Sequence, residues 1–269
     1  MKRESFKDFK RICRGNKSIE MKKEKSWWHA LPRFISIYIT WILVKTTISA
    51  NLITIFSIII GLTGLLLIGL SKSLLIIIGF TFLYIYFILD EVDGEVARYK
   101  KSTSVQGVFY DEVGHLLIHT GLFFTFGYSI YRITSVNLFL ILGILAAFSI
   151  LGIRIIRQIP LIASSKGSVK IIIKDEKNDV ENKPSKKSFT KIFFYIFKNI
   201  TTAFCTTIII TTTYFVSYLL YSIYDNSQIL KLTMVSYTIF MFIVFLYFII
   251  ARSRTIEKDV IKSYKMMNE

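Results

Sequence analysis

The chain of 269 residues is strongly apolar and strongly basic at the same time. Hydrophobic residues make up 53% of it and the mean hydropathy is +0.52, values too high for an ordinary soluble domain. The formal net charge of +16 could suggest nucleic-acid binding, but the basic residues are spread over four segments and no recognition motif accompanies them. The composition therefore predicts an integral membrane protein.

The first 50 residues hold a basic stretch and one short apolar run. That run, residues 34–44, has only 11 residues, about half of what a membrane-crossing helix needs. Ser36 and Thr40 follow Arg33 at helical spacing. We expect an amphipathic helix lying in the membrane interface. The alternative is a helix packed on the ends of the spans, and the two descriptions are compatible.

Six longer apolar runs follow. Four have at least 20 residues, enough to cross a ~30 Å hydrocarbon core as a helix. The other two have 16 residues and extend at one end into a charged segment. The expected spans are residues 51–70, 74–89, 116–131, 133–153, 199–224 and 232–251. The fold class is therefore predicted to be all-α, with six transmembrane helices preceded by an N-terminal interfacial amphipathic helix.

The basic residues also predict the orientation. Of the 34 Lys and Arg residues, 31 lie before residue 51, within 90–110, within 154–198 or after residue 250. Such an excess is typical of cytoplasmic segments, so both termini and the charged segment are expected on the cytoplasmic side of the cell membrane. The domains are then a basic N-terminus with the interfacial helix (1–50), a six-span domain (51–251) with a flexible cytosolic loop (157–190), and a basic tail (252–269).

The segment LDEVDGEVARYKKSTSVQGVFYDEVGHLL, residues 89–117, concentrates six carboxylates between the second and third apolar runs. Its polar and small residues form two helical stripes, one on each side of an eight-residue connection. The stripes are Asp90, Asp93, Gly94, Ala97 and Arg98, and then Gly107, Asp111 and His115. Because two helices joined so closely are antiparallel neighbours, we expect the acids and the histidine to share one pocket.

Carboxylates gathered in this way repel one another unless cations neutralise them. Hard oxygen ligands suit Mg²⁺, so the pattern favours a divalent metal site. The small residues would leave a groove beside the acids, and Arg98 offers a fixed cation suited to a phosphate. Small residues in membrane helices also serve close packing, and the acids could instead be solvated helix ends paired with Arg98 and nearby lysines.

These residues resemble the motif of the CDP-alcohol phosphotransferases, D-x2-D-G-x2-A-R-x8-G-x3-D-x3-D. Residue type and spacing match at Asp90, Asp93, Gly94, Ala97, Arg98, Gly107 and Asp111. His115 stands where the family has its fourth aspartate. Ser104 matches a common family residue. TTISANLIT at 46–54 resembles the start of the family's first span, with Ala50 in place of a proline.

The resemblance implies a reaction in phospholipid or related polar-lipid synthesis. A hydroxyl acceptor attacks a CDP-linked alcohol or CDP-diacylglycerol, a phosphodiester forms and CMP leaves. It also implies two divalent ions, Mg²⁺ or Mn²⁺, bridged by Asp90 and Asp111, with Asp93 binding one of them. The CDP group is expected at Gly94, Ala97, Arg98, Ser104 and Gly107. Family members are often dimers, so a homodimer is possible.

The role of His115 has three interpretations. As a general base, a neutral imidazole with an ordinary pKa near ~6.5 would accept the acceptor's proton, so His115 and Asp111 are the expected catalytic residues. As a metal ligand beside Asp90, Asp93 and Asp111, it would favour Mn²⁺ or a softer ion. The third interpretation is loss of activity. His119, one turn further, is expected to be a core residue, although it could orient His115 across one helical turn.

Two further points stay open at the level of sequence. Arg154 and Arg157 could bind the phosphate of an acceptor, or could simply be basic anchors at the end of a span. The alternative function is a catalytically degenerate family member or a cation-binding membrane transporter. A transporter is disfavoured because broken helices and internal repeats at the bilayer midplane are missing from the sequence.

Overall fold

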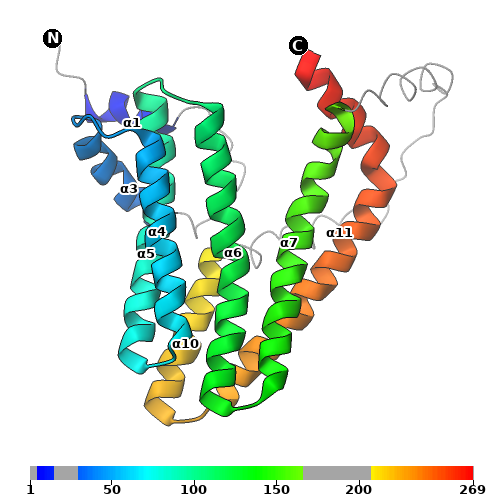
Figure 1. Ribbon diagram of the computed structural model, residues 1–269. Coiled ribbons are helices and arrows are strands. Elements are labelled where there is room, and N and C mark those ends of the chain that lie inside the picture. Colours follow the sequence, from blue (N-terminus) through cyan, green and yellow to red (C-terminus); the bar gives the residue numbers. More distant parts are fainter. Residues whose placement is uncertain (1–4, 15–29, 166–206, 269) are drawn as a thin grey trace.

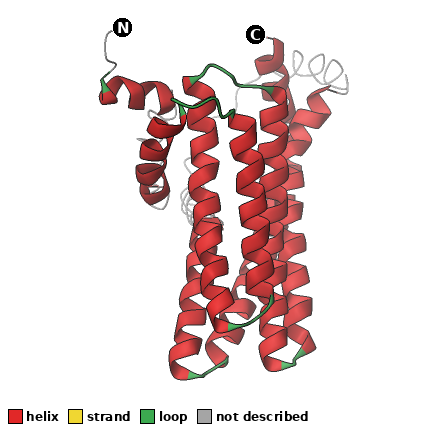
Figure 2. Ribbon diagram, turned by 60° about the vertical axis from the view of Figure 1, so that its left-hand side comes forward, coloured by secondary structure: helices red, strands yellow, loops and turns green. Residues whose placement is uncertain are grey.

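The computed structural model of the protein describes residues 5–14, 30–165 and 207–268. These residues form eight helices and no strand (Figure 2). The helices are α1 (Phe6–Arg14), α3 (Ala30–Leu43), α4 (Ala50–Gly69), α5 (Ser73–Tyr99), α6 (Val105–Thr134), α7 (Asn137–Ser165), α10 (Thr207–Tyr224) and α11 (Gln228–Asn268). In this part of the chain six helices are long and apolar enough to cross a membrane. The predicted all-helical class with six spans is therefore confirmed.

Several helices are longer than the apolar runs that predicted them. The spans expected at 74–89 and 116–131 belong to α5 and α6, which include nearly all of the charged segment. The helix expected at 133–153 continues as α7 to Ser165, so residues 157–165 are helical instead of forming the start of a loop. Residues 166–190 of that loop, and 199–206 of the fifth run, lie outside the described residues. Polar residues do not end a helix at the membrane edge because its backbone hydrogen bonds form independently of side-chain polarity.

Figure 1 shows how the helices meet. The span α4 packs against both α5 and α6, and α7 packs along α11 and α6. α6 and α7 lie close at their connection and diverge toward the end of the molecule where α1 and the α5–α6 connection lie (Figure 1). A large buried core joins α4, α5, α6, α7, α10 and α11. The end that carries α1 also carries the charged segment.

The spans α4 and α5 touch through their backbones at a pair of glycines. A Cβ atom added to Gly79 would lie 2.6 Å from the Gly64 carbonyl oxygen, and one added to Gly64 would lie 2.8 Å from the Gly79 carbonyl oxygen. Small residues allow this close approach, which dispersion forces then stabilise. The crossing fixes the relative position of the two helices that build the charged end.

Replacing Gly79 by alanine is therefore expected to destabilise the protein by about 1–3 kcal/mol, because the new methyl group overlaps backbone atoms that cannot move independently. The measurement is thermal unfolding of the purified protein in detergent. Gly69→Ala is the matched control, since its Cβ would meet only side-chain atoms at 3.7 and 3.8 Å. Equal melting temperatures for the two variants would contradict the close backbone contact.

The short helix α3 packs on α5 through its polar stripe. Ser36 and Thr40 are completely buried and donate hydrogen bonds to Glu95, with oxygen–oxygen distances of 3.1 and 2.7 Å. Arg33 Nε donates to Glu91 Oε1 at 3.0 Å. The opposite stripe is apolar and exposed, and consists of Leu31, Phe34, Tyr38 and Ile42. This helix is therefore packed against a span, as one of the two descriptions predicted. Its outer stripe is of the kind that an interfacial helix presents to lipid.

Candidate active site

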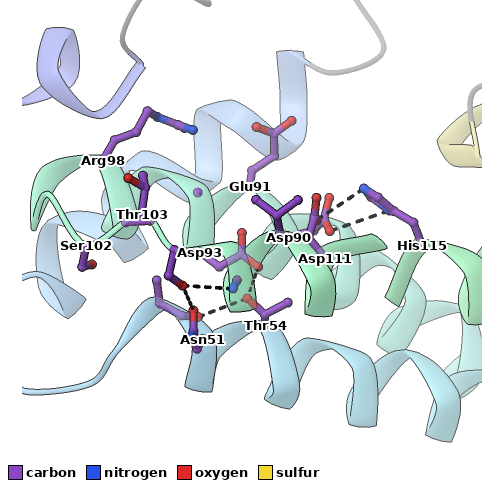
Figure 3. A pocket seen from close by; sticks show the side chains of 16 residues that line it. Asn51, Thr54, Asp90, Glu91, Asp93, Arg98, Ser102, Thr103, Asp111 and His115 are labelled. Atoms are coloured by element: carbon purple, nitrogen blue, oxygen red, sulfur yellow. Dashed lines mark hydrogen bonds and ion pairs between the residues drawn. The ribbon is translucent and has the colours of Figure 1, made fainter. Parts of the chain in front are cut away.

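A cavity of about 410 Å³ lies among the ends of α4, α5 and α6 (Figure 3). All nine residues that the sequence singled out for metal, CDP or catalysis line it: Asp90, Asp93, Gly94, Ala97, Arg98, Ser104, Gly107, Asp111 and His115. They meet because α4 packs against both α5 and α6, and the short connection between Tyr99 and Val105 keeps the two stripes at the same end of the bundle. The expectation that α5 and α6 are packed directly against each other is wrong, since α4 provides most of the contact between them. The cavity also takes residues from the start of α4.

Asp90, Asp111 and His115 form the tightest cluster of potential ligands. One side-chain ligand atom from each lies within 4.8 Å of the other two. His115 Nε2 is 3.5 Å from Asp111 Oδ1, and His115 Nδ1 is 3.9 Å from Asp90 Oδ1. The two carboxylates belong to different helices, Asp90 to α5 and Asp111 to α6. Two carboxylates and one imidazole at this separation fit a divalent cation.

Asp93 is held differently. Its side chain is almost completely buried, and Thr54 Oγ1 of α4 donates a hydrogen bond to its Oδ2 at 2.6 Å. Asp93 lines the cavity but is not a member of the cluster of Asp90, Asp111 and His115. Its role as a metal ligand therefore stays a prediction.

The two glycines of the motif lie where side chains would obstruct polar groups. A Cβ on Gly107 would be 2.9 Å from Asn51 Oδ1 and 3.3 Å from Ser104 Oγ. Ser104 caps α6, since its Oγ accepts a hydrogen bond from the Gly107 N–H at 3.0 Å. A Cβ on Gly94 would be 3.1 Å from Arg98 Nη1. The predicted groove is thus formed by bare backbone next to an amide, a hydroxyl and a guanidinium.

Several residues outside the motif also belong to the site. The Tyr86 hydroxyl is 3.3 Å from His115 Nδ1, and Tyr86 is 1% exposed. Asn51, Thr54 and Glu91 line the cavity with the motif residues (Figure 3). A signal for Tyr86 was present, because it precedes Asp90 by four residues and so continues the same helical stripe. Asn51 and Thr54 belong to the TTISANLIT segment, which resembles the start of the family's first span. No residue of that segment was predicted to line the site.

A second cluster of polar side chains, His119, Arg154 and Glu112, adjoins His115. The ring centroids of His115 and His119 are 4.9 Å apart, and Arg154 Nη1 is 3.4 Å from His119 Nδ1. Arg154 Nη2 also donates to Glu112 Oε2 at 2.6 Å. His119 is half-buried, with a polar partner of its own and a ring contact to His115, so its place in the core and its role in orienting His115 both stay predictions. Arg154 does not line the cavity.

Arg157, the other arginine considered for phosphate binding, also lies away from the cavity lining. Its guanidinium carbon is 4.8 Å from the centre of the Phe248 ring of α11. This cation–π contact stabilises the packing of α7 on α11.

The comparison with known families agrees with the site. Residues 47–266 match the family model described as CDP-alcohol phosphatidyltransferase. No curated protein matches the chain in sequence. The family match covers well over half of the chain, and the cavity built from α4, α5 and α6 lies inside it. The chain therefore belongs to the CDP-alcohol phosphatidyltransferase family.

Proposed function

We propose that this protein is an active, divalent-metal-dependent phosphotransferase. It transfers the phosphorylated alcohol of a CDP-linked alcohol, or the phosphatidyl group of CDP-diacylglycerol, to a hydroxyl acceptor and releases CMP. Family membership implies a CDP donor and an alcohol acceptor. The observation that carries the proposal of activity is the cluster of Asp90, Asp111 and His115 on the wall of the motif cavity.

The cluster fits the metal ions that the family uses. Carboxylate oxygens from two helices converge there, which suits Mg²⁺ or Mn²⁺. Asp90 and Asp111 would hold both of two ions, and Asp93 would hold one of them. Such ions would supply positive charge that stabilises the attacking and leaving oxygens.

Donor binding and proton transfer would be carried out by residues of the protein itself. Arg98 and the bare backbone at Gly94 and Gly107 bind the phosphates of the donor. The acceptor oxygen bonds to the phosphorus that carries the alcohol, and the bond from this phosphorus to the bridging oxygen breaks, so CMP leaves with the electron pair. His115 Nε2, beside Asp111, receives the hydroxyl proton when Nδ1–H donates to the Tyr86 hydroxyl oxygen.

The positive-inside distribution supports a site that opens to the cytoplasm, with both termini on that side of the cell membrane. Such a site would draw its substrates from the cytosol and the inner leaflet, as phospholipid or related polar-lipid synthesis requires. We also propose that the protein forms a homodimer, as members of the family often do.

The function is tested with membranes that contain the protein, a panel of CDP-linked alcohols and CDP-diacylglycerol, and a panel of hydroxyl acceptors. The expected result is CMP release that requires Mg²⁺ or Mn²⁺ together with one donor–acceptor pair. Membranes with the Asp111→Ala variant at the same protein level are the control. Absence of CMP release from every pair, at saturating metal, would indicate a degenerate member or a cation-binding protein without catalysis.

A further inference from the structure

Helix α1 lies outside the segment that matches the family, which begins at residue 47, yet it is packed against the site-bearing helix α5. Its Phe9 and Cys13 are completely buried. The Phe9 ring is 4.7 Å from the Trp41 ring of α3 and 5.1 Å from the Tyr99 ring of α5, measured between centroids. α1 is therefore docked by an aromatic cluster at the end of α5.

The last turn of α1 accepts a hydrogen bond from Arg98, the arginine of the motif. The carbonyl oxygen of Cys13 accepts a hydrogen bond from Arg98 Nε at 2.5 Å. The last carbonyls of a helix lack intrahelical partners and carry partial negative charge, so a guanidinium is a suitable partner. Among the described residues, Arg98 Nη1 and Nη2 make no hydrogen bond, and Nη1 lies beside Gly94 on the cavity wall.

The same end of α1 is also linked, through Arg33 of α3, to Glu91 on that wall. Arg14 Nη2 donates to the carbonyl oxygen of Arg33 at 3.2 Å, and Arg33 Nε donates to Glu91 Oε1 at 3.0 Å. Glu91 and Arg98 both line the cavity, across from Asn51 and Thr54 in the view of Figure 3. One charged group is thus held by α1 directly and the other through α3.

We propose that α1 is a positioning element of the active site, whose last turn holds the Arg98 guanidinium ready to bind the pyrophosphate of the CDP donor. The inference rests on the proposed function, because it assigns Arg98 to the donor. Arginine has many rotamers, and a substrate that must order it binds more weakly. With Nε already bonded to α1, the two Nη groups face the cavity before the donor arrives. Preorganisation of one such side chain corresponds to about 3- to 10-fold in affinity.

The test uncouples α1 in the full-length protein with Phe9→Asp, which places a charge in the aromatic cluster. KM for the donor, and the Kd of CDP measured by titration calorimetry with Mg²⁺, are expected to rise about 3- to 10-fold. The value of kcat should change little, because uniform binding is lost and the reacting groups stay in place. Phe9→Leu, which keeps an apolar side chain at this position, is the matched control and should behave like the unmodified protein. If Phe9→Asp does not fold, Phe9→Ala is measured in its place.

A double-mutant cycle separates positioning from general damage. Arg98→Ala alone should raise KM and Kd, and Phe9→Asp should then add nothing further, because the guanidinium that α1 holds is gone. Additive effects of the two substitutions would overturn the inference. An effect of Arg98→Ala without any effect of Phe9→Asp would overturn the role of α1 and leave the donor site intact. No effect of Arg98→Ala would instead show that Arg98 does not bind the donor.

Discussion

Replacing Asp111 by alanine is expected to lower CMP release by more than about 10³-fold at any Mg²⁺ or Mn²⁺ concentration. Asp111 contributes to the cluster with Asp90 and is also the carboxylate 3.5 Å from His115 Nε2. Its loss removes a proposed metal ligand and the neighbour of the proposed base in a single change. The measurement is the rate of CMP release per amount of protein in purified membranes.

Two substitutions calibrate this result. Asp93→Ala should cost less, because Asp93 lies outside the cluster and is held by Thr54. Glu112→Gln is the matched control, since this neighbouring acid points to Arg154 and does not line the cavity. It should keep most of the activity. Substantial CMP release by Asp111→Ala would place the chemistry on other residues.

His115→Ala is expected to lose about 10²–10⁴-fold in rate, the range for removing a positioned general base. His115→Asp should retain much more activity, because it restores the family's carboxylate four residues after Asp111. Both rates are measured with the donor–acceptor pair found for the unmodified protein. Equal and complete loss in the two variants would mean that the site works only with an imidazole.

Metal titration decides between the two active roles of His115. If it is the base, His115→Ala needs the same metal concentration for half of its maximal rate, and saturation does not restore the rate. If it is mainly a ligand beside Asp90, the required metal concentration rises and saturation restores much of the loss. A variant as active as the unmodified protein without added metal would exclude both roles.

Much of this architecture follows from local patterns. The six spans were predictable because each apolar run is close to the length that a bilayer requires. The pocket residues were predictable because Asp90 and Asp93, and then Asp111 and His115, recur at helical spacing on either side of a short connection. The helix ends were less predictable, because hydropathy stops at the first charge whereas the backbone hydrogen bonds of α5 continue to Tyr99.

Only the tertiary structure decided which partners the site residues have. The sequence by itself determined that Asp90, Asp93 and Asp111 share one end of the bundle, since helical period and chain connectivity are local properties. Packing of α4 against α5 joined Thr54 to Asp93 and left Asp93 outside the cluster. Docking of α1 joined Arg98 to the backbone carbonyl of residue 13. Every residue has a carbonyl, so no side-chain pattern marks such a contact, and only the packing of distant helices selects the one that is used.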